Sequence, residues 1–136
     1  MSSLLSGVTV LDLTINVPGP FCSMNLSDLG ARVIKIEPPG GDPLRSEKEM
    51  WDNLNRGKES IVLNLKSTKD KLYLSKLAKI ANIVIEGWRP GVAKRLSADY
   101  ETLKKENDQL IYCSISGFWQ EGEWNIRPGH DINYLA

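Results

Sequence analysis

The residues best suited to proton transfer lie in one short run, Gly129-His130-Asp131-Ile132-Asn133-Tyr134. His130 is the only histidine in the chain, and histidine is the side chain whose ordinary pKa lies nearest neutrality. It follows a Pro-Gly pair and has polar neighbours, so we predict a general acid or base. A structural histidine is the competing interpretation. Asp131 either orients the imidazole or caps a helix that begins there, and capping preferences favour the second role.

Other kinds of reaction centre find little support in the sequence. A lone histidine cannot build a metal site, and Cys22 and Cys113 lack metal-binding spacing, so we expect no metal and buried, reduced thiols. The first strand-to-helix turn lacks the G-x-G-x-x-G dinucleotide pattern, and no G-x-S-x-G nucleophile elbow occurs. We therefore expect no permanently bound cofactor.

A second possible chemistry is the binding of an anion. Arginines and lysines follow several predicted strands closely, and such side chains bind phosphate well. For any one of them taken alone, a solvated surface charge is the favoured interpretation. The candidates are Arg45, Lys66, Arg89 and Arg95.

The elements that would position these residues alternate along the chain. Short β-rich runs predict strands, and capped apolar patterns predict helices. Alternating strands and helices predict a parallel, doubly wound, Rossmann-like α/β sheet. In such a sheet the loops at the carboxyl ends of the strands share one edge, where ligands bind. The predicted strands cover residues 8–13, 32–37, 60–65, 82–86 and 110–116; the predicted helices cover 20–29, 68–79, 92–96 and 97–107, with a mixed segment at 46–56 anchored by Trp51 and a loop at 117–129.

Composition narrows the class of protein. The chain of 136 residues suits one domain, and its 17 basic and 17 acidic residues argue against general nucleic-acid binding. No apolar run approaches the ~20 residues of a membrane helix, so we expect no membrane partner. The N-terminus resembles no secretory signal, which favours a cytoplasmic location.

Several motifs together resemble the N-terminal part of the family III coenzyme-A transferases, and within them the α-methylacyl-CoA racemase branch. The likeness extends over essentially the whole chain. The most discriminating motif is the run around His130, because the racemase branch carries histidine there and transferase members usually carry tyrosine. The other motifs are Leu5–Leu13, Pro18-Gly19-Pro20, Asp28–Ala31, Ile36–Arg45, Asn55–Lys58, Leu63–Lys66 and Glu86–Val92.

The resemblance implies that residues 1–136 form the N-terminal part of a CoA-binding large domain, with an acyl-CoA thioester as substrate and interlocked homodimers as the assembly. Pro38 stands where racemases often carry a phosphate-binding arginine, and Arg45 is the expected substitute. The residues implied along the CoA site are Arg45, Leu63, Leu65, Lys66, Gly87, Arg89, Arg95, Asp131 and Tyr134.

The resemblance also implies a role for His130 as one member of an acid/base pair that inverts the α-carbon of a 2-methylacyl-CoA through an enolate. It places the partner Asp, a supporting Glu and the second domain beyond Ala136, so we expect no racemisation by these residues alone. Two alternatives remain open. One is CoA transfer between carboxylic acids through an acyl-enzyme on an Asp outside the chain, and the other is a non-catalytic CoA-binding module or a folding fragment.

Overall fold

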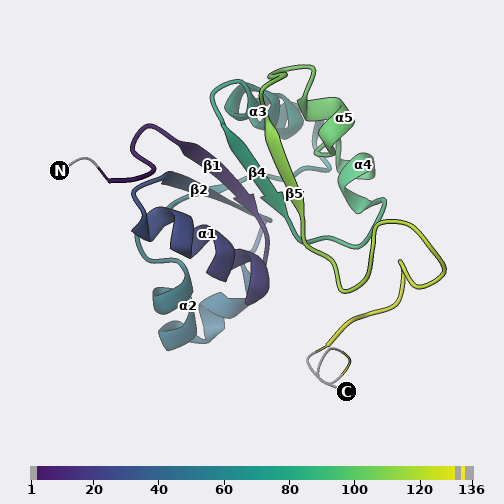
Figure 1. Ribbon diagram of the computed structural model, residues 1–136, viewed down its shortest axis with the longest axis horizontal. Helices are drawn as coiled ribbons and strands as arrows, with labels where there is room; N and C mark the ends of the chain where they lie inside the picture. Colours follow the sequence, from purple (N-terminus) through teal and green to yellow (C-terminus); the bar gives the residue numbers. More distant parts are fainter. Residues whose placement is uncertain (1–2, 131–132, 134–136) are drawn as a thin grey trace.

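The computed structural model describes residues 3–130 and 133 of the chain. It is a five-stranded parallel sheet with helices on both faces (Figure 1), as the alternating pattern predicts. The elements are β1 (Thr9–Leu13), α1 (Pro18–Asp28), β2 (Arg32–Glu37), the 3-10 turn η1 (Pro43–Ser46), α2 (Lys48–Leu54), β3 (Glu59–Val62), α3 (Thr68–Ala78), β4 (Ile83–Glu86), α4 (Val92–Leu96), α5 (Tyr100–Leu103) and β5 (Ile111–Ser114).

The strand order is β3-β2-β1-β4-β5, and every neighbouring pair is parallel. The connections therefore run outward from β1 toward β3 and then return to β4, so the topological switch point lies between β1 and β4. In open α/β sheets this is where the crevice for ligands forms. Val10 of β1 pairs with Val33 of β2 on one side and Ile83 of β4 on the other.

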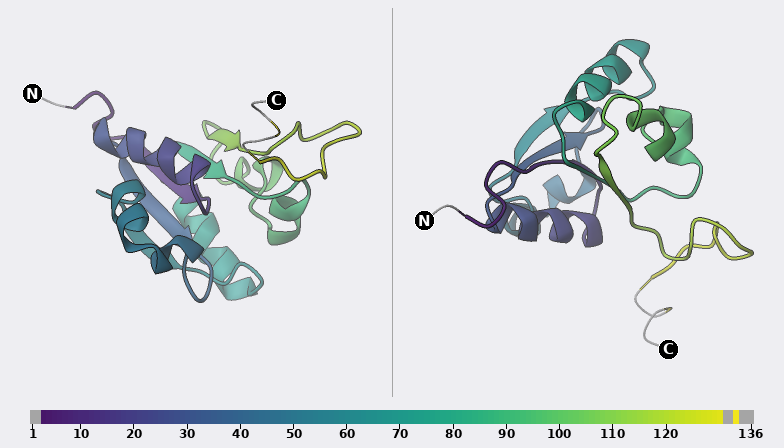
Figure 2. Two further views of the ribbon diagram at one scale, coloured as in Figure 1. Left: turned by 90° about the horizontal axis from the view of Figure 1, so that it is seen from below. Right: turned by 45° about the horizontal axis from the view of Figure 1, so that its top comes forward.

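Side-chain alternation along the two central strands divides the core into two layers. Leu11, Leu13, Ile34 and Ile36 pack with residues of α3 and of the segment that includes α4 and α5. Val10 and Val33 pack on the opposite face, with partly buried side chains of α1. Figures 1 and 2 show α1 and α2 on one side of the sheet and α3, α4 and α5 on the other.

Several predicted elements differ from the structure. The mixed segment at 46–56 contains helix α2, which buries only Leu54 and so lacks an apolar stripe in the sequence. The helix predicted at 97–107 is reduced to α5, because Ser97 adopts a left-handed conformation with φ of 58° and Asp99 caps a new start. Strand β3 ends at Val62 rather than residue 65, and α1 begins two residues earlier than predicted, with Pro18 in its first turn.

The two cysteines are free, as predicted, but each is half-buried rather than fully buried. Within the described part of the chain, no helix is long and apolar enough to cross a membrane. The helix predicted from Asp131 onward falls largely outside the described residues.

Candidate functional site

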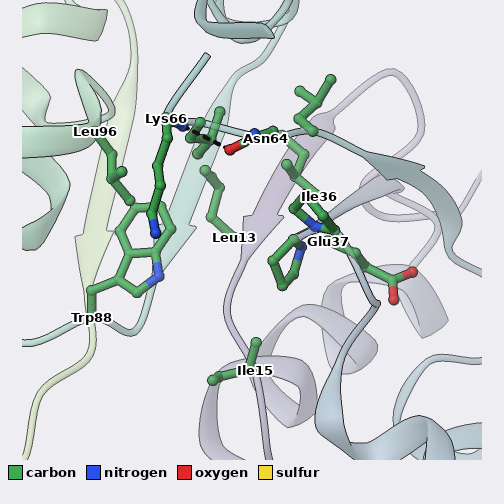
Figure 3. Close-up of a pocket in the computed structure, with 12 residues that line it drawn as sticks. Leu13, Ile15, Ile36, Glu37, Asn64, Lys66, Trp88 and Leu96 are labelled. Atoms are coloured by element: carbon green, nitrogen blue, oxygen red, sulfur yellow. Dashed lines mark hydrogen bonds between the residues drawn. The ribbon is translucent and has the colours of Figure 1, made fainter.

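A pocket of about 450 Å³ opens at the carboxyl edge of the sheet, on the face covered by α3 and α4. It gathers residues from the ends of β1, β2, β3 and β4, which spans the switch point (Figure 3). Most of its wall is apolar, as is usual for sites that enclose organic ligands. The lining residues are Leu13, Ile15, Ile36, Glu37, Pro38, Pro39, Leu63, Asn64, Leu65, Lys66, Trp88 and Leu96.

The turn after β3 presents Lys66 to this pocket. The Asn64 side-chain oxygen accepts a hydrogen bond of 3.1 Å from the backbone N–H of Lys66, drawn as a dashed line in Figure 3. The backbone N–H of Asn64 in turn donates to Asp70 in the first turn of α3, at 2.8 Å. These bonds fix the backbone of the turn and leave the Lys66 side chain exposed at the rim, while Leu63 and Leu65 are buried.

The turn after β4 contributes the aromatic wall. The backbone N–H of Trp88 donates to Glu86 Oε2 at 2.8 Å, and the Ser114 hydroxyl donates to the other Glu86 oxygen. Glu86 is buried, so its carboxylate ties the end of β4 to β5 and orients the turn. Gly87 brings the backbone of this turn beside the Thr14 side chain, which joins the ends of β1 and β4.

Of the predicted cations, one lines the pocket and two are sequence neighbours of lining residues. Lys66 lines it, Arg89 follows Trp88, and Arg95 precedes the lining residue Leu96. All three side chains are exposed, and none forms an ion pair with a carboxylate among residues 3–130 and 133. Unpaired cations beside an apolar pocket suit an anionic ligand with an organic body.

The opposite face of the same edge holds a buried cluster of charges that sequence reasoning missed. Asp12 is fully buried, and its Oδ2 lies 3.1 Å from Lys58 Nζ and 3.9 Å from Lys35 Nζ. Lys35 Nζ also lies 2.9 Å from Asp42 Oδ2 and donates to the carbonyl oxygen of Thr14. The contact between Lys35 and Asp42 is an ion pair and not a hydrogen bond. Among the described residues, Asp42 Oδ2 has no hydrogen-bond donor in the required geometry.

The two lysines of this cluster favour the charged form of Asp12. Burial acts to raise the pKa of Asp12, but Lys35, Lys58 and the hydroxyls of Ser23 and Thr14 together outweigh it and lower that pKa. Burial lowers the pKa of Lys58, and Asp12 opposes that effect. The cluster joins β1, β2 and the segments next to them, so its evident role is structural.

Arg45, a predicted phosphate ligand, lies on this second face. Its guanidinium donates two hydrogen bonds to Glu37, of 2.7 Å to Oε2 and 2.6 Å to Oε1. These bonds, more than any other cause, lower the pKa of the Glu37 carboxyl to about 2. The guanidinium carbon of Arg45 also lies 4.0 Å from the centre of the Trp51 ring.

His130 is exposed and is not among the residues that line the pocket. Its backbone N–H donates to the Asn133 side-chain oxygen at 2.9 Å, and the Asn133 N–H donates back to its carbonyl at 2.7 Å. In Figure 1 the segment after β5 leaves the sheet and extends away from it. Asp131 and Tyr134, predicted along the CoA site, lie outside the described residues.

The structure thus brings Leu63, Leu65 and Lys66 together in one pocket, with Gly87, Arg89 and Arg95 next to lining residues. The sequence placed Pro38, Pro39 and Trp88 in loops at the carboxyl ends of predicted strands, where ligands bind, but they were not among the predicted site residues. The structure adds them to the site as parts of its apolar wall. Among residues 3–130 and 133, no group of three or more His, Cys, Asp or Glu is arranged to hold a metal.

A parallel sheet of this strand order, with helices on both faces and a pocket at its carboxyl edge, is a doubly wound α/β fold. The family model "CoA-transferase family III" matches residues 5–136, so the chain belongs to that family. The chain is 42% identical to the human "Alpha-methylacyl-CoA racemase" over 132 residues, covering 97% of this chain and 33% of the relative. It is 46% identical to the "Acetyl-CoA:oxalate CoA-transferase" of Acetobacter aceti over 133 residues, covering 92% and 34%.

Solved structures agree with the fold. A CAIB/BAIF family protein from Brucella suis superposes with a TM-score of 0.92 at 35% identity, over 97% of this chain and 38% of that chain. The chain spans about a third of the length of the curated relatives it matches. The racemase and the transferase match at similar identity, so the comparisons establish the family and not the reaction.

Proposed function

We propose that residues 1–136 form the N-terminal part of the CoA-binding domain of an α-methylacyl-CoA racemase-like protein. The observation that carries the CoA role is the apolar pocket with Lys66 in its lining, and with Arg89 and Arg95 next in sequence to the lining residues Trp88 and Leu96. Coenzyme A combines a flat base with several phosphates, which suits such a wall and such cations. The backbone around Leu63, Leu65 and Gly87 would lie along the ligand, with Asp131 and Tyr134 completing the contacts.

Binding of coenzyme A to the chain, measured by titration calorimetry, tests this role. Lys66→Gln, Arg89→Gln and Arg95→Gln should each weaken binding by about 3- to 10-fold, because each removes a charge-assisted contact. Lys105→Gln is the matched control, since Lys105 is also exposed but follows α5, near the start of β5 and away from the pocket. Equal losses in all four variants would point to general electrostatics and against a site.

The proposed reaction is inversion of the α-carbon of a 2-methylacyl-CoA. The thioester carbonyl acidifies the α-proton, a base on one face removes it, and an acid on the other face returns one to the enolate. His130 serves one face of that carbon. Its Gly-His-Asp context supports the racemase branch, because the transferase branch usually carries tyrosine at this point. The group for the other face lies outside these residues in our proposal.

Exchange of the α-proton in deuterium oxide tests the proposed catalytic role of His130. We expect no exchange of 2-methylacyl-CoA by this chain, and exchange that depends on His130 in a longer protein that continues past residue 136. The matched variant is His130→Gln, which removes the titrating imidazole and keeps a polar side chain. Rapid exchange by the chain itself would contradict the proposal that a second group is needed.

The 46% identity to an acetyl-CoA:oxalate CoA-transferase supports a second candidate, CoA transfer between carboxylic acids through an acyl-enzyme. Incubating a longer protein with an acyl-CoA and hydroxylamine would trap such an intermediate as a hydroxamate on an Asp. A trapped adduct without α-proton exchange would favour transfer over racemisation. The proposed homodimer and the cytoplasmic location need their own measurements, by light scattering and by cell fractionation.

A further inference from the structure

We propose that Arg45 is a positioning residue that fixes one wall of the pocket from behind, and that it does not bind the phosphates of the ligand. The proposal rests on the pocket of the proposed function. It assigns Arg45 a role different from the one that the sequence resemblance implies. The evidence is the face of the sheet on which Glu37 lies, the bidentate hydrogen bonding of the Arg45 guanidinium to Glu37, and the way the intervening loop is anchored.

Strand alternation places the Glu37 carboxylate behind the pocket. Ile36 belongs to the core layer under α3 and lines the pocket, so the next side chain along β2 points to the other face. Figure 3 shows this directly, since the carboxylate of Glu37 points away from the space between Leu13 and Trp88. Glu37 is counted among the lining residues, but it is only 1% exposed, so it presents no accessible charge to a ligand in the pocket.

Arg45 is held in one orientation by its contacts with Glu37 and Trp51. Its Nε and one terminal nitrogen bind the two Glu37 oxygens, and its guanidinium stacks on Trp51 of α2. The Ser60 hydroxyl also donates to Glu37, which completes the shell around that carboxylate. A bidentate, stacked arginine is fixed in orientation, and releasing it would leave a buried carboxylate without its cation.

The loop between these two residues forms the wall itself. Pro38 and Pro39 line the pocket, and the backbone N–H of Asp42 donates to Glu37 Oε2 at 2.9 Å. Asp42 is held from its other side by buried Lys35. Gly41 has a φ of +86°, and a Cβ there would lie 2.9 Å from Arg45 Cδ, so the loop closes directly over the pair.

The wall is therefore anchored at both ends by buried carboxylates. A pocket wall that is already ordered in the free protein loses less conformational entropy when the ligand binds. Breaking the Glu37–Arg45 pair would release the Pro38-Pro39 segment and weaken every ligand that touches it, with or without phosphate. A direct phosphate contact predicts a different pattern, in which removing Glu37 liberates Arg45 and binding improves or stays unchanged.

Two measurements on Glu37→Gln, Arg45→Gln and the double variant separate these roles. The first is the affinity for coenzyme A at low and moderate salt. We expect each single variant to lose about 5- to 20-fold, the double variant to lose no more than either, and the salt dependence to equal that of the unaltered chain. Arg95→Gln is the control, and it should reduce the salt dependence because that arginine forms no ion pair within the part of the chain that the structure describes.

The second measurement is hydrogen exchange at the Asp42 amide, which needs no ligand. We expect exchange to become at least about 10-fold faster in every variant of the pair, because the acceptor of that amide is disturbed. Unchanged exchange would overturn the proposal, as would tighter coenzyme A binding by Glu37→Gln alongside weaker binding by Arg45→Gln. If the unaltered chain binds no coenzyme A, the proposed function fails, and the exchange measurement still decides the role of Arg45.

Discussion

The two faces of the sheet's carboxyl edge handle charge in opposite ways. On the α1 and α2 face, Asp12, Lys35 and Glu37 are buried, and each meets a partner of opposite charge. On the α3 and α4 face, the pocket wall is mostly apolar, and Lys66 in its lining forms no ion pair with any residue that the structure describes. Paired charges hold loops in place, and unpaired ones are available to a ligand. The same residue type therefore has different roles on the two faces.

The largest expected effect comes from breaking the buried cluster. Lys35→Met removes the only cation within ion-pair distance of Asp42 in the described residues and one of two beside Asp12. Removing one partner of a buried pair typically costs about 3–5 kcal/mol, since a charge is left uncompensated. Urea unfolding would measure the loss. Lys48→Met is the control, because its pair with Asp52 is exposed and contributes about 1 kcal/mol or less. A loss for Lys35→Met no greater than for the control would contradict the structural role.

A second effect is acid sensitivity carried by Glu37. Its pKa of about 2 lies below the ordinary value of 4.5, so the native state favours the charged form. The resulting stability is present above about pH 4.5 and disappears as the pH falls toward 2. Its size is at most about 3 kcal/mol, and less because Arg45 is half exposed to solvent. Unfolding free energies should fall more steeply across this window in the unaltered chain than in Glu37→Gln, and parallel slopes would refute the assignment.

On the pocket face, Trp88→Ala should weaken coenzyme A binding by roughly 10-fold, or about 1.4 kcal/mol, because it removes the aromatic wall. Trp119→Ala is the matched control. That tryptophan is 87% exposed and does not line the pocket, so its loss should leave the affinity unchanged. Equal effects of the two substitutions would move the binding site toward the segment after β5.

The smallest expected effect sharpens the contrast between the faces. Arg89→Gln should change the free energy of unfolding by no more than about 0.5 kcal/mol, since its side chain is exposed and has no ion-pair partner in the described residues. Thermal or urea unfolding of the variant would check this. A loss comparable to that of Lys35→Met would show that Arg89 supports the fold, and its assignment to the ligand site would have to be abandoned.

Sequence reasoning found all five strands because each is a short run of strand-favouring residues bounded by turn residues. It missed α2, since a helix that buries one residue leaves no periodic signal. It also interpreted the alternation of Arg32–Glu37 as an ordinary strand, with no sign that Lys35 is buried. Alternation identifies two faces but cannot say whether a helix covers the polar one.

What the sequence determined by itself was the α/β class, the family resemblance and the loops that carry candidate residues. These follow from local patterns and short motifs. What only the tertiary structure decided was which of those residues face one another. Arg45 and Lys66 follow successive strands and look equivalent in sequence, yet one is paired behind the wall and the other is open to the pocket. The physical reason is that pairing and burial depend on partners distant in the sequence, such as Ser60 beside Glu37.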